Sequence, residues 1–263
     1  MTHWIASVAR KLITGRLRAF TTPLLVLPLL GCPSLACHDV AEAIRANDIE
    51  ALRRYHDDGV DIDCVTSRLN DNGASALYLA VHHDAWECFL YLLESGADPN
   101  VKTRIAGSAM HAAACKKTPR WAAKLHEYGG DVNSYRREGT PYQMAPLHSV
   151  ICLAGSEESV ETTRWFIENG ADIEAIASED TTPLSAALSS YHLAIAAELV
   201  EAGASLDAVV LGKRATTHIE ALCDDNVYNQ HIGWSFTEKD LQSFLLALKK
   251  RDVVFDCEQL RVE

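Results

Sequence analysis

A short motif that recurs along the chain constrains its fold more than any other feature. A glycine, a small residue and usually an acid follow one another at 59–61, 96–98, 129–131, 170–172 and 203–205. Two of the four intervals between these glycines are equal, at about 33 residues, and the other two are longer. An apolar run typical of a helix precedes each glycine. A repeat of this period predicts stacked units, each of which buries its apolar face against its neighbours.

A second motif begins a short distance after four of these glycines. It reads Ser-Ala-Leu-Tyr at 75–78, Ser-Ala-Met-His at 108–111, Ala-Pro-Leu-His at 145–148 and Thr-Pro-Leu-Ser at 182–185. Ser and Thr cap the start of a helix, and Pro is tolerated in its first turn. A glycine after a second helix supplies a left-handed cap. Each unit is therefore predicted to be a pair of helices that ends at the glycine.

The second motif resembles the Thr-Pro-Leu-His element that opens an ankyrin repeat, and Gly-Ala-Asp resembles the element that closes its second helix. The resemblance covers roughly positions 38–210. It implies an all-α ankyrin-repeat solenoid of about five repeats with finger loops between them. The first unit, 38–63, lacks the opening motif, and no repeat is recognisable beyond Ala208. Terminal repeats are expected to be atypical because one of their faces meets water.

The chain after the repeats, 211–263, is expected to form a C-terminal helical cap. Its segment 238–250 has a helical apolar pattern. The apolar side is expected to carry Leu241, Phe244, Leu245 and Leu248.

The segment 1–31 has the composition of a secretory signal peptide, and the repeat domain is expected to occupy 32–210. Four basic residues and no acid precede an apolar run at 24–30, which is the order of a signal sequence. The run is shorter than the roughly 20 residues that cross a bilayer, and Pro28 interrupts it. We therefore expect a removable leader rather than a permanent membrane span.

The leader ends in Leu29-Leu30-Gly31-Cys32, which resembles the lipobox of bacterial lipoproteins. The resemblance implies cleavage before Cys32 and a diacylglycerol on its thiol; ordinary cleavage nearby, for instance after Ala36, is the alternative. Because Pro33 rather than Asp follows, similarity to enterobacterial lipoproteins implies the outer membrane. We therefore expect a periplasmic protein that touches the outer membrane through its N-terminal lipid only.

The charge balance restricts the partners of the chain. Its formal net charge is −12, and removal of the leader, with four basic residues, would bring it to about −16. Such a charge disfavours binding to nucleic acid or to an anionic lipid surface. It is compatible with a basic protein partner, and we expect the free chain to be monomeric.

The eight cysteines are too few for a disulfide scaffold and include no Cys-x-x-Cys pair. Cys88, Cys115 and Cys152 lie in apolar helical patterns and are predicted to be small core residues. Cys37 is expected just before the first helix of unit one, and Cys64 follows the second. Antiparallel helices bring these ends together, so a disulfide between Cys37 and Cys64 is predicted in an oxidising compartment.

Two intervals exceed the basic period, and the extra length is placed in the finger at 65–72, in the finger at 134–144 and in a turn near 153–157. The second finger contains Tyr135, Arg136, Arg137 and Tyr142. Aromatic residues and arginine are enriched among interface anchors.

By resemblance, ankyrin-like proteins bind partners with finger tips and with the concave side of their first helices. The basic residues nearby extend the predicted partner surface of the second finger, and they include Arg104, Lys116 and Lys117, with Lys102 and Arg120. His82, His83 and Tyr191, near the ends of first helices, are expected on the concave side. A solvated loop of ordinary charge is the alternative interpretation.

Catalytic and metal-binding patterns are not found. His82, His83 and Asp84 occupy adjacent positions that point in different directions, so no metal site is expected. His111 and His148 are expected to hydrogen-bond a neighbouring loop. No phosphate loop, dinucleotide fingerprint or nucleophile motif occurs. We expect neither a cofactor nor enzymatic activity.

A fold alone does not give a function. Small acidic secreted lipoproteins of ankyrin-like repeats resemble immunity proteins, which bind and inhibit antibacterial type VI secretion effectors, particularly phospholipases that act from the periplasm. The resemblance therefore implies an inhibitor whose partner is a secreted lipase effector. The alternative is a general envelope scaffold that holds another periplasmic protein, and a ligand-binding protein or enzyme on a repeat frame is disfavoured.

Overall fold

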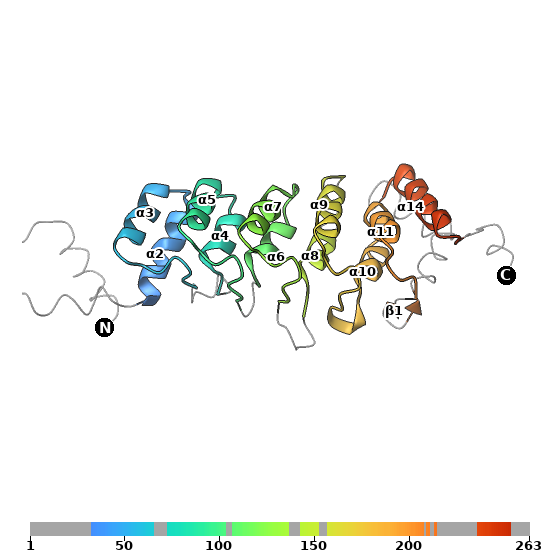
Figure 1. Cartoon of the computed structure of the whole chain (residues 1–263), viewed down its shortest axis with the longest axis horizontal. Coiled ribbons are helices and arrows are strands. Elements are labelled where there is room, and N and C mark those ends of the chain that lie inside the picture. The colour runs from blue at the N-terminus through green and yellow to red at the C-terminus, as the bar shows by residue number, and fades with distance from the viewer. Residues whose placement is uncertain are drawn as a thin grey trace, which may run out of the picture.

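Five consecutive pairs of helices, followed by one further helix, make up the described part of the chain (Figure 1). The computed structural model describes residues 33–65, 73–103, 107–136, 143–152, 157–207, 209–210, 213–214 and 236–253. The first helices of the pairs are α2 (Pro33–Arg45), α4 (Ala76–His82), α6 (Ala109–Ala114), α8 (Pro146–Cys152) and α10 (Pro183–Ser189). The second helices are α3 (Ile49–Asp57), α5 (Trp86–Glu94), α7 (Arg120–Glu127), α9 (Glu157–Glu168) and α11 (Leu193–Glu201). The last helix is α14 (Glu238–Lys250).

The pairs stack into an elongated solenoid with two layers of helices (Figure 1). The first helices form a continuous layer, in which α2 contacts α4, α4 contacts α6, α6 contacts α8, and α8 contacts α10. In the second layer α3 contacts α5 and α9 contacts α11. The described ends of the loops that join one pair to the next leave the stack on the side of the first helices (Figure 1). The bases of the finger loops therefore share one edge of the molecule.

The helix starts and the repeat glycines adopt the geometry predicted from the two motifs. The Ser75 Oγ accepts a hydrogen bond from the Tyr78 N–H at 3.2 Å, and Ser108 and Thr182 form capping boxes. The five repeat glycines have φ angles of 83°, 89°, 86°, 84° and 101°. Left-handed backbone of this kind favours glycine because it lacks a Cβ. The motifs thus mark the beginning and the end of each unit.

A ladder of side-chain hydrogen bonds connects neighbouring units. Asn100 accepts from the Asp131 N–H at 2.8 Å and donates to the Gly129 carbonyl at 2.8 Å. Asn133 makes the same two bonds one unit later, to the Asp172 N–H and the Gly170 carbonyl. Each asparagine therefore bridges two units with both ends of its amide.

At the two ends of the array the ladder carries acids instead. The Asp63 Oδ1 accepts from the Asp98 N–H at 2.9 Å. The Glu174 Oε1 accepts from the Ser205 N–H at 2.6 Å. An ionised carboxylate has no hydrogen to donate, so it cannot form the second bond of the amide.

The C-terminal helix α14 covers the end of the stack by packing against α11. Its buried side chains are Phe244, Ala247 and Leu248, and Leu241 is half-buried. Leu245, which was expected on the same side as these residues, is 39% exposed. The main contact of α14 is with a single helix, so its buried stripe is narrower than the apolar pattern.

Two further differences concern the edges of the repeat region. Helix α2 begins at Pro33, ahead of the start expected for unit one at position 38; proline is tolerated in a first helical turn. After α11 the short strands β1 (Val209–Val210) and β2 (Lys213–Arg214) pair antiparallel.

Positions 153–156 of the predicted insertion lie outside the described residues, and position 157 is the first residue of α9. Helix α9, with 12 residues, is longer than the other second helices. No helix in the described ranges has the length and apolar character to cross a membrane.

Candidate protein-binding surface

The finger at 134–144 is tied to the stack at its base. Arg136 and Met144 form an antiparallel bridge with N–H to carbonyl distances of 2.9 and 3.1 Å. The His111 Nε2 of α6 lies 2.9 Å from the Met144 carbonyl. The hydroxyls of Ser108 and Ser134 lie 2.9 Å apart, and both residues are buried. The finger therefore leaves the solenoid from a fixed starting geometry.

The predicted partner residues of this finger fall in two groups. Tyr135 and Arg136 are half-buried at its base. The Arg136 Nη2 lies 3.5 Å from the Met144 sulfur, and its buried Nε has no hydrogen-bond partner in the described structure. Arg137 and Tyr142 lie outside the described residues, as does Arg104 of the preceding finger. The side chains of the finger base thus face the repeats as well as solvent.

His82 and His83 are exposed at the end of α4. The His82 ring stacks on Tyr78 with a centroid distance of 5.9 Å, and the His83 ring meets His82 edge-on at 5.0 Å. Tyr191 has a left-handed φ of 56° in the turn between α10 and α11, and its partly buried ring packs against the core. His82 and His83 therefore lie outside the core, whereas Tyr191 contributes partly to packing.

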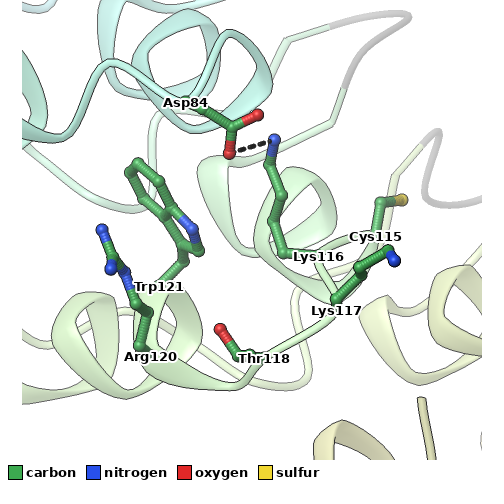
Figure 2. Close-up of a pocket in the computed structure, with 7 residues that line it drawn as sticks. All are labelled: Asp84, Cys115, Lys116, Lys117, Thr118, Arg120 and Trp121. Atoms are coloured by element: carbon green, nitrogen blue, oxygen red, sulfur yellow. Dashed lines mark hydrogen bonds and ion pairs between the residues drawn. The ribbon is translucent and has the colours of Figure 1, made fainter. Parts of the chain in front are cut away.

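A pocket of about 490 Å³ lies between the turn after α4 and the turn after α6 (Figure 2). We call it the turn pocket, and it is lined by Asp84, Cys115, Lys116, Lys117, Thr118, Arg120 and Trp121. Lys116 and Lys117 were predicted partner residues, and the structure places both on its wall. The turn pocket holds three cations and one carboxylate in a chain with a net charge of −12.

Trp121 is the aromatic residue that lines the turn pocket, and Arg120 of the pocket wall contacts both Trp121 and Trp86. The Arg120 guanidinium lies 3.9 Å from the Trp86 ring centroid and 5.3 Å from that of Trp121. The two indoles meet edge-on at 4.7 Å. An arginine held on aromatic faces keeps its charge and its N–H edge for a ligand. Arg120 was among the predicted basic residues, but both tryptophans were missed, because they come from different units and no sequence motif joins them.

Lys116 connects the turn pocket to the preceding unit. Its Nζ lies 2.8 Å from the Asp84 Oδ1 and 3.2 Å from the His82 carbonyl. The lysine side chain is 17% exposed and the aspartate side chain 69% exposed. Lys117 is exposed, and in Figure 2 it points away from Lys116, toward the side of Cys115.

The cysteines occupy different environments. Cys88 is buried as predicted, but Cys115 is exposed, so its assignment to the core was wrong. Helix α6 ends at Ala114, and Cys115 begins the turn instead of continuing the apolar face. Cys152 is the last residue of α8, and its place in the core stays a prediction. Cys32, the predicted lipidation site, lies outside the described residues.

Cys37 and Cys64 are both buried, and both are free thiols. Burial is the main cause that raises the pKa of the Cys64 thiol, and a hydrogen bond with Cys37 is the second. The sequence predicts Cys37 just before the first helix of unit one, but the residue lies inside α2. The two thiols are therefore neighbours, and the disulfide between them stays a prediction.

Two buried histidines, His111 and His148, hold the loop of the following unit. The His148 Nε2 lies 3.1 Å from the Thr181 carbonyl, which matches the contact of His111 with Met144. Burial lowers the pKa of both rings, and that of His111 falls to about 4. The structural role predicted for these histidines is confirmed. In the part of the chain that the structure describes, no cluster of His, Cys, Asp and Glu could hold a metal ion.

The known proteins that the chain resembles include ankyrin repeat proteins. The Ankyrin repeat family model matches residues 72–104. An ankyrin repeat protein of fowlpox virus is 26% identical over 188 residues, which is 72% of this chain and 37% of that protein. A second fowlpox virus ankyrin repeat protein is 25% identical over 144 residues, or 55% of this chain and 18% of its own length.

Alpha-latrocrustotoxin-Lt1a of Latrodectus tredecimguttatus is 29% identical over 108 residues, which is 41% of this chain and 7% of the toxin. This chain thus spans well under half the length of these relatives. With the helix pairs and the family match together, the all-α ankyrin-repeat solenoid is confirmed.

Proposed function

We propose that this ankyrin-repeat chain is an immunity protein, which binds and inhibits an antibacterial type VI secretion effector of the phospholipase class. Ankyrin repeats form protein–protein interaction modules, and the finger at 134–144 is the single observation that carries the assignment of the binding surface. The stack does not need the extra length, because each unit already buries its helices within the basic period. Its base is nevertheless fixed by a bridge and by His111. A loop base pre-organised in this way loses little entropy on binding.

The immunity role is supported by the combination of acidic charge, lipobox and repeats. A lipid on Cys32 would hold the inhibitor at the membrane that the effector attacks, which raises its effective concentration there. Helix α2 begins at Pro33, so no linker would separate the lipid from the first unit. We propose a periplasmic location with this anchor in the outer membrane.

The finger is tested with Tyr135→Ala and Arg137→Ala, singly and together. Surface changes usually alter the free energy of unfolding by less than about 0.5 kcal/mol. Loss of a hot spot should weaken partner binding by about 2 kcal/mol. Lys124→Ala, on α7 and outside the finger, is the matched control. Calorimetric binding that stays within a factor of two for all three finger variants would overturn this assignment.

The immunity role is tested with the full chain and a phospholipase effector that it captures from a lysate of effector-producing cells. The purified chain should inhibit lipid hydrolysis at a one-to-one ratio. Cells that export it should survive the effector, and cells with the finger double variant should die. Capture of a partner without toxic activity would instead support the general envelope scaffold.

A further inference from the structure

We propose that the turn pocket binds an acidic peptide segment of the protein partner, with the carboxylates of that segment meeting Lys117 and Arg120. This inference rests on the proposed function, since the ligand is part of the partner. It adds a second contact region and the chemistry of what that region recognises.

The first support is that the turn of unit three is wider than the corresponding turns. Asn47, Asp84 and Tyr191 lie in short turns between paired helices, with left-handed φ angles of 50°, 59° and 56°. In unit three the longer segment 115–119 separates α6 from α7. The spacing from helix cap to repeat glycine is nevertheless the same from 75 to 96 as from 108 to 129. The extra turn residues therefore come from shorter helices, and they open the pocket.

The second support is that this wide turn is held in place. The buried Thr162 hydroxyl of α9 lies 3.4 Å from the carbonyls of both Lys116 and Lys117. On the other side, Lys116 is bound to Asp84 and to the His82 carbonyl. The turn is thus braced by the units before and after it. Cations on a braced turn are pre-organised for a ligand.

The third support is the local charge. Three of the seven residues that line the turn pocket are cations, and Asp84, their one carboxylate, is bound to Lys116. Glu87 interacts with Arg120, but its carboxylate also accepts a hydrogen bond from the Asn47 amide. The pocket wall therefore carries an excess of positive charge. Hydrogen bonds from cationic groups to carboxylates are stronger than bonds between neutral groups.

The arrangement of the cations favours a peptide over a single compact anion. Figure 2 shows Lys116 directed at Asp84, Lys117 on the opposite side toward Cys115, and Arg120 beside Trp121. These groups diverge, whereas a single phosphate is bound by donors that converge on it. Carboxylates spaced along an extended segment can meet divergent cations one by one. A long polyanion or an anionic membrane would be repelled by the rest of the chain, whose net charge is −12.

The test uses the purified full chain and a fluorescein-labelled peptide of alternating Glu and Gly. The matched peptide has Gln in place of Glu. Fluorescence anisotropy should show binding of the Glu peptide that weakens with added salt, and no binding of the Gln peptide. Lys117→Gln and Arg120→Gln should each weaken binding by about tenfold, the change expected from the loss of one charged contact. Lys124→Gln, which removes a lysine of α7 outside the pocket, should bind as the parent does.

Cys115 supplies a readout that is specific to the site. It is exposed on the wall of the turn pocket, so the Glu peptide should slow its alkylation by iodoacetamide, as measured by peptide mass mapping. Equal binding of the Gln peptide, unchanged binding by Lys117→Gln and Arg120→Gln, or unprotected Cys115 would overturn the proposal. So would displacement of the peptide by equimolar inorganic phosphate, or tighter binding of anionic phosphatidylglycerol vesicles than of the peptide.

The outcomes separate this inference from the proposed function. Suppose that a captured effector binds more weakly to the finger variants but equally well to Lys117→Gln and Arg120→Gln. The immunity role would then stand, and the turn pocket would have no part in it. Peptide binding with the expected charge dependence, without any inhibition of an effector, would leave the pocket standing and remove the immunity role.

Discussion

Acidification should destabilise the solenoid through His111. This ring is 2% exposed. Its Nδ1 accepts a hydrogen bond from the Ser108 N–H at 3.2 Å, and its Nε2 donates to the Met144 carbonyl at 2.9 Å. A proton added at Nδ1 would remove the acceptor of the Ser108 N–H and place a charge in the core. These effects agree with the lowering of the His111 pKa from 6.5 to about 4, chiefly by burial.

The sign and size of the effect follow from proton linkage. Below pH 6.5 the unfolded chain binds a proton that the native His111 does not, so stability falls as the pH falls. The loss accumulates until the native ring is protonated as well, near pH 4. Over the whole interval it reaches about 3 kcal/mol, and between pH 7 and pH 5 about 2 kcal/mol. The lowered pKa values of His148 and His192 act in the same direction.

Urea unfolding at several values between pH 7 and pH 5 measures this slope while most carboxylates stay ionised. Glutamine in His111→Gln keeps one donor and one acceptor but does not titrate. Between pH 7 and pH 5 the free energy of unfolding of this variant should therefore fall by about 2 kcal/mol less than that of the parent chain. His82→Gln, which changes an exposed histidine, should leave the slope unchanged. A slope equal to that of the parent chain in His111→Gln would refute the reasoning, whatever the absolute stability of the variant.

Three further changes test other contacts. Asn133→Ala removes both ladder bonds between its units and should lower the free energy of unfolding by about 2 kcal/mol in urea, whereas an unchanged midpoint would show that water replaces them. Phe244→Ala should cost about 3–5 kcal/mol because the fully buried ring attaches α14 to α11; equal stability would mean that α14 does not support the stack. A Cys37–Cys64 bridge closes the segment between these positions into a loop, so the oxidised chain should be about 3 kcal/mol more stable than the reduced chain. Cys37→Ser should abolish that difference, and two free thiols in periplasmic protein would exclude the bridge.

The repeat architecture was predictable because its signals are local. A capping serine or threonine, a leucine in the first turn and a terminal glycine each act within a few residues of their own position. Their recurrence therefore predicted the helix pairs and the contacts of His111 and His148 with neighbouring loops. The same locality explains the error at Cys115: the apolar pattern of unit three continues past Ala114, but Pro119 takes the N-cap position of α7 and the helices shorten.

The binding surface was less predictable because its parts come from different units. Lys116 and Arg120 stand out in the sequence, but their respective neighbours Asp84 and Trp86 belong to the preceding unit. The brace from Thr162 comes from the following unit, far along the chain. The burial of α14 likewise depends on a second element: this helix packs against α11, and Leu245 is 39% exposed while Ala247 is buried.

The asparagine ladder would have a mechanical consequence if the proposed lipid on Cys32 tethers the chain at its first unit. In the ladder, the side-chain amides of Asn100 and Asn133 each make two hydrogen bonds to the next unit, whereas Asp63 makes one at the first junction, close to the like charge of Asp98. In a solenoid each unit holds only its neighbours, so a pull at the N-terminus loads the junctions in series. Under tension unit one should peel away first and lengthen the tether, while the fingers and the turn pocket stay assembled on the units behind it.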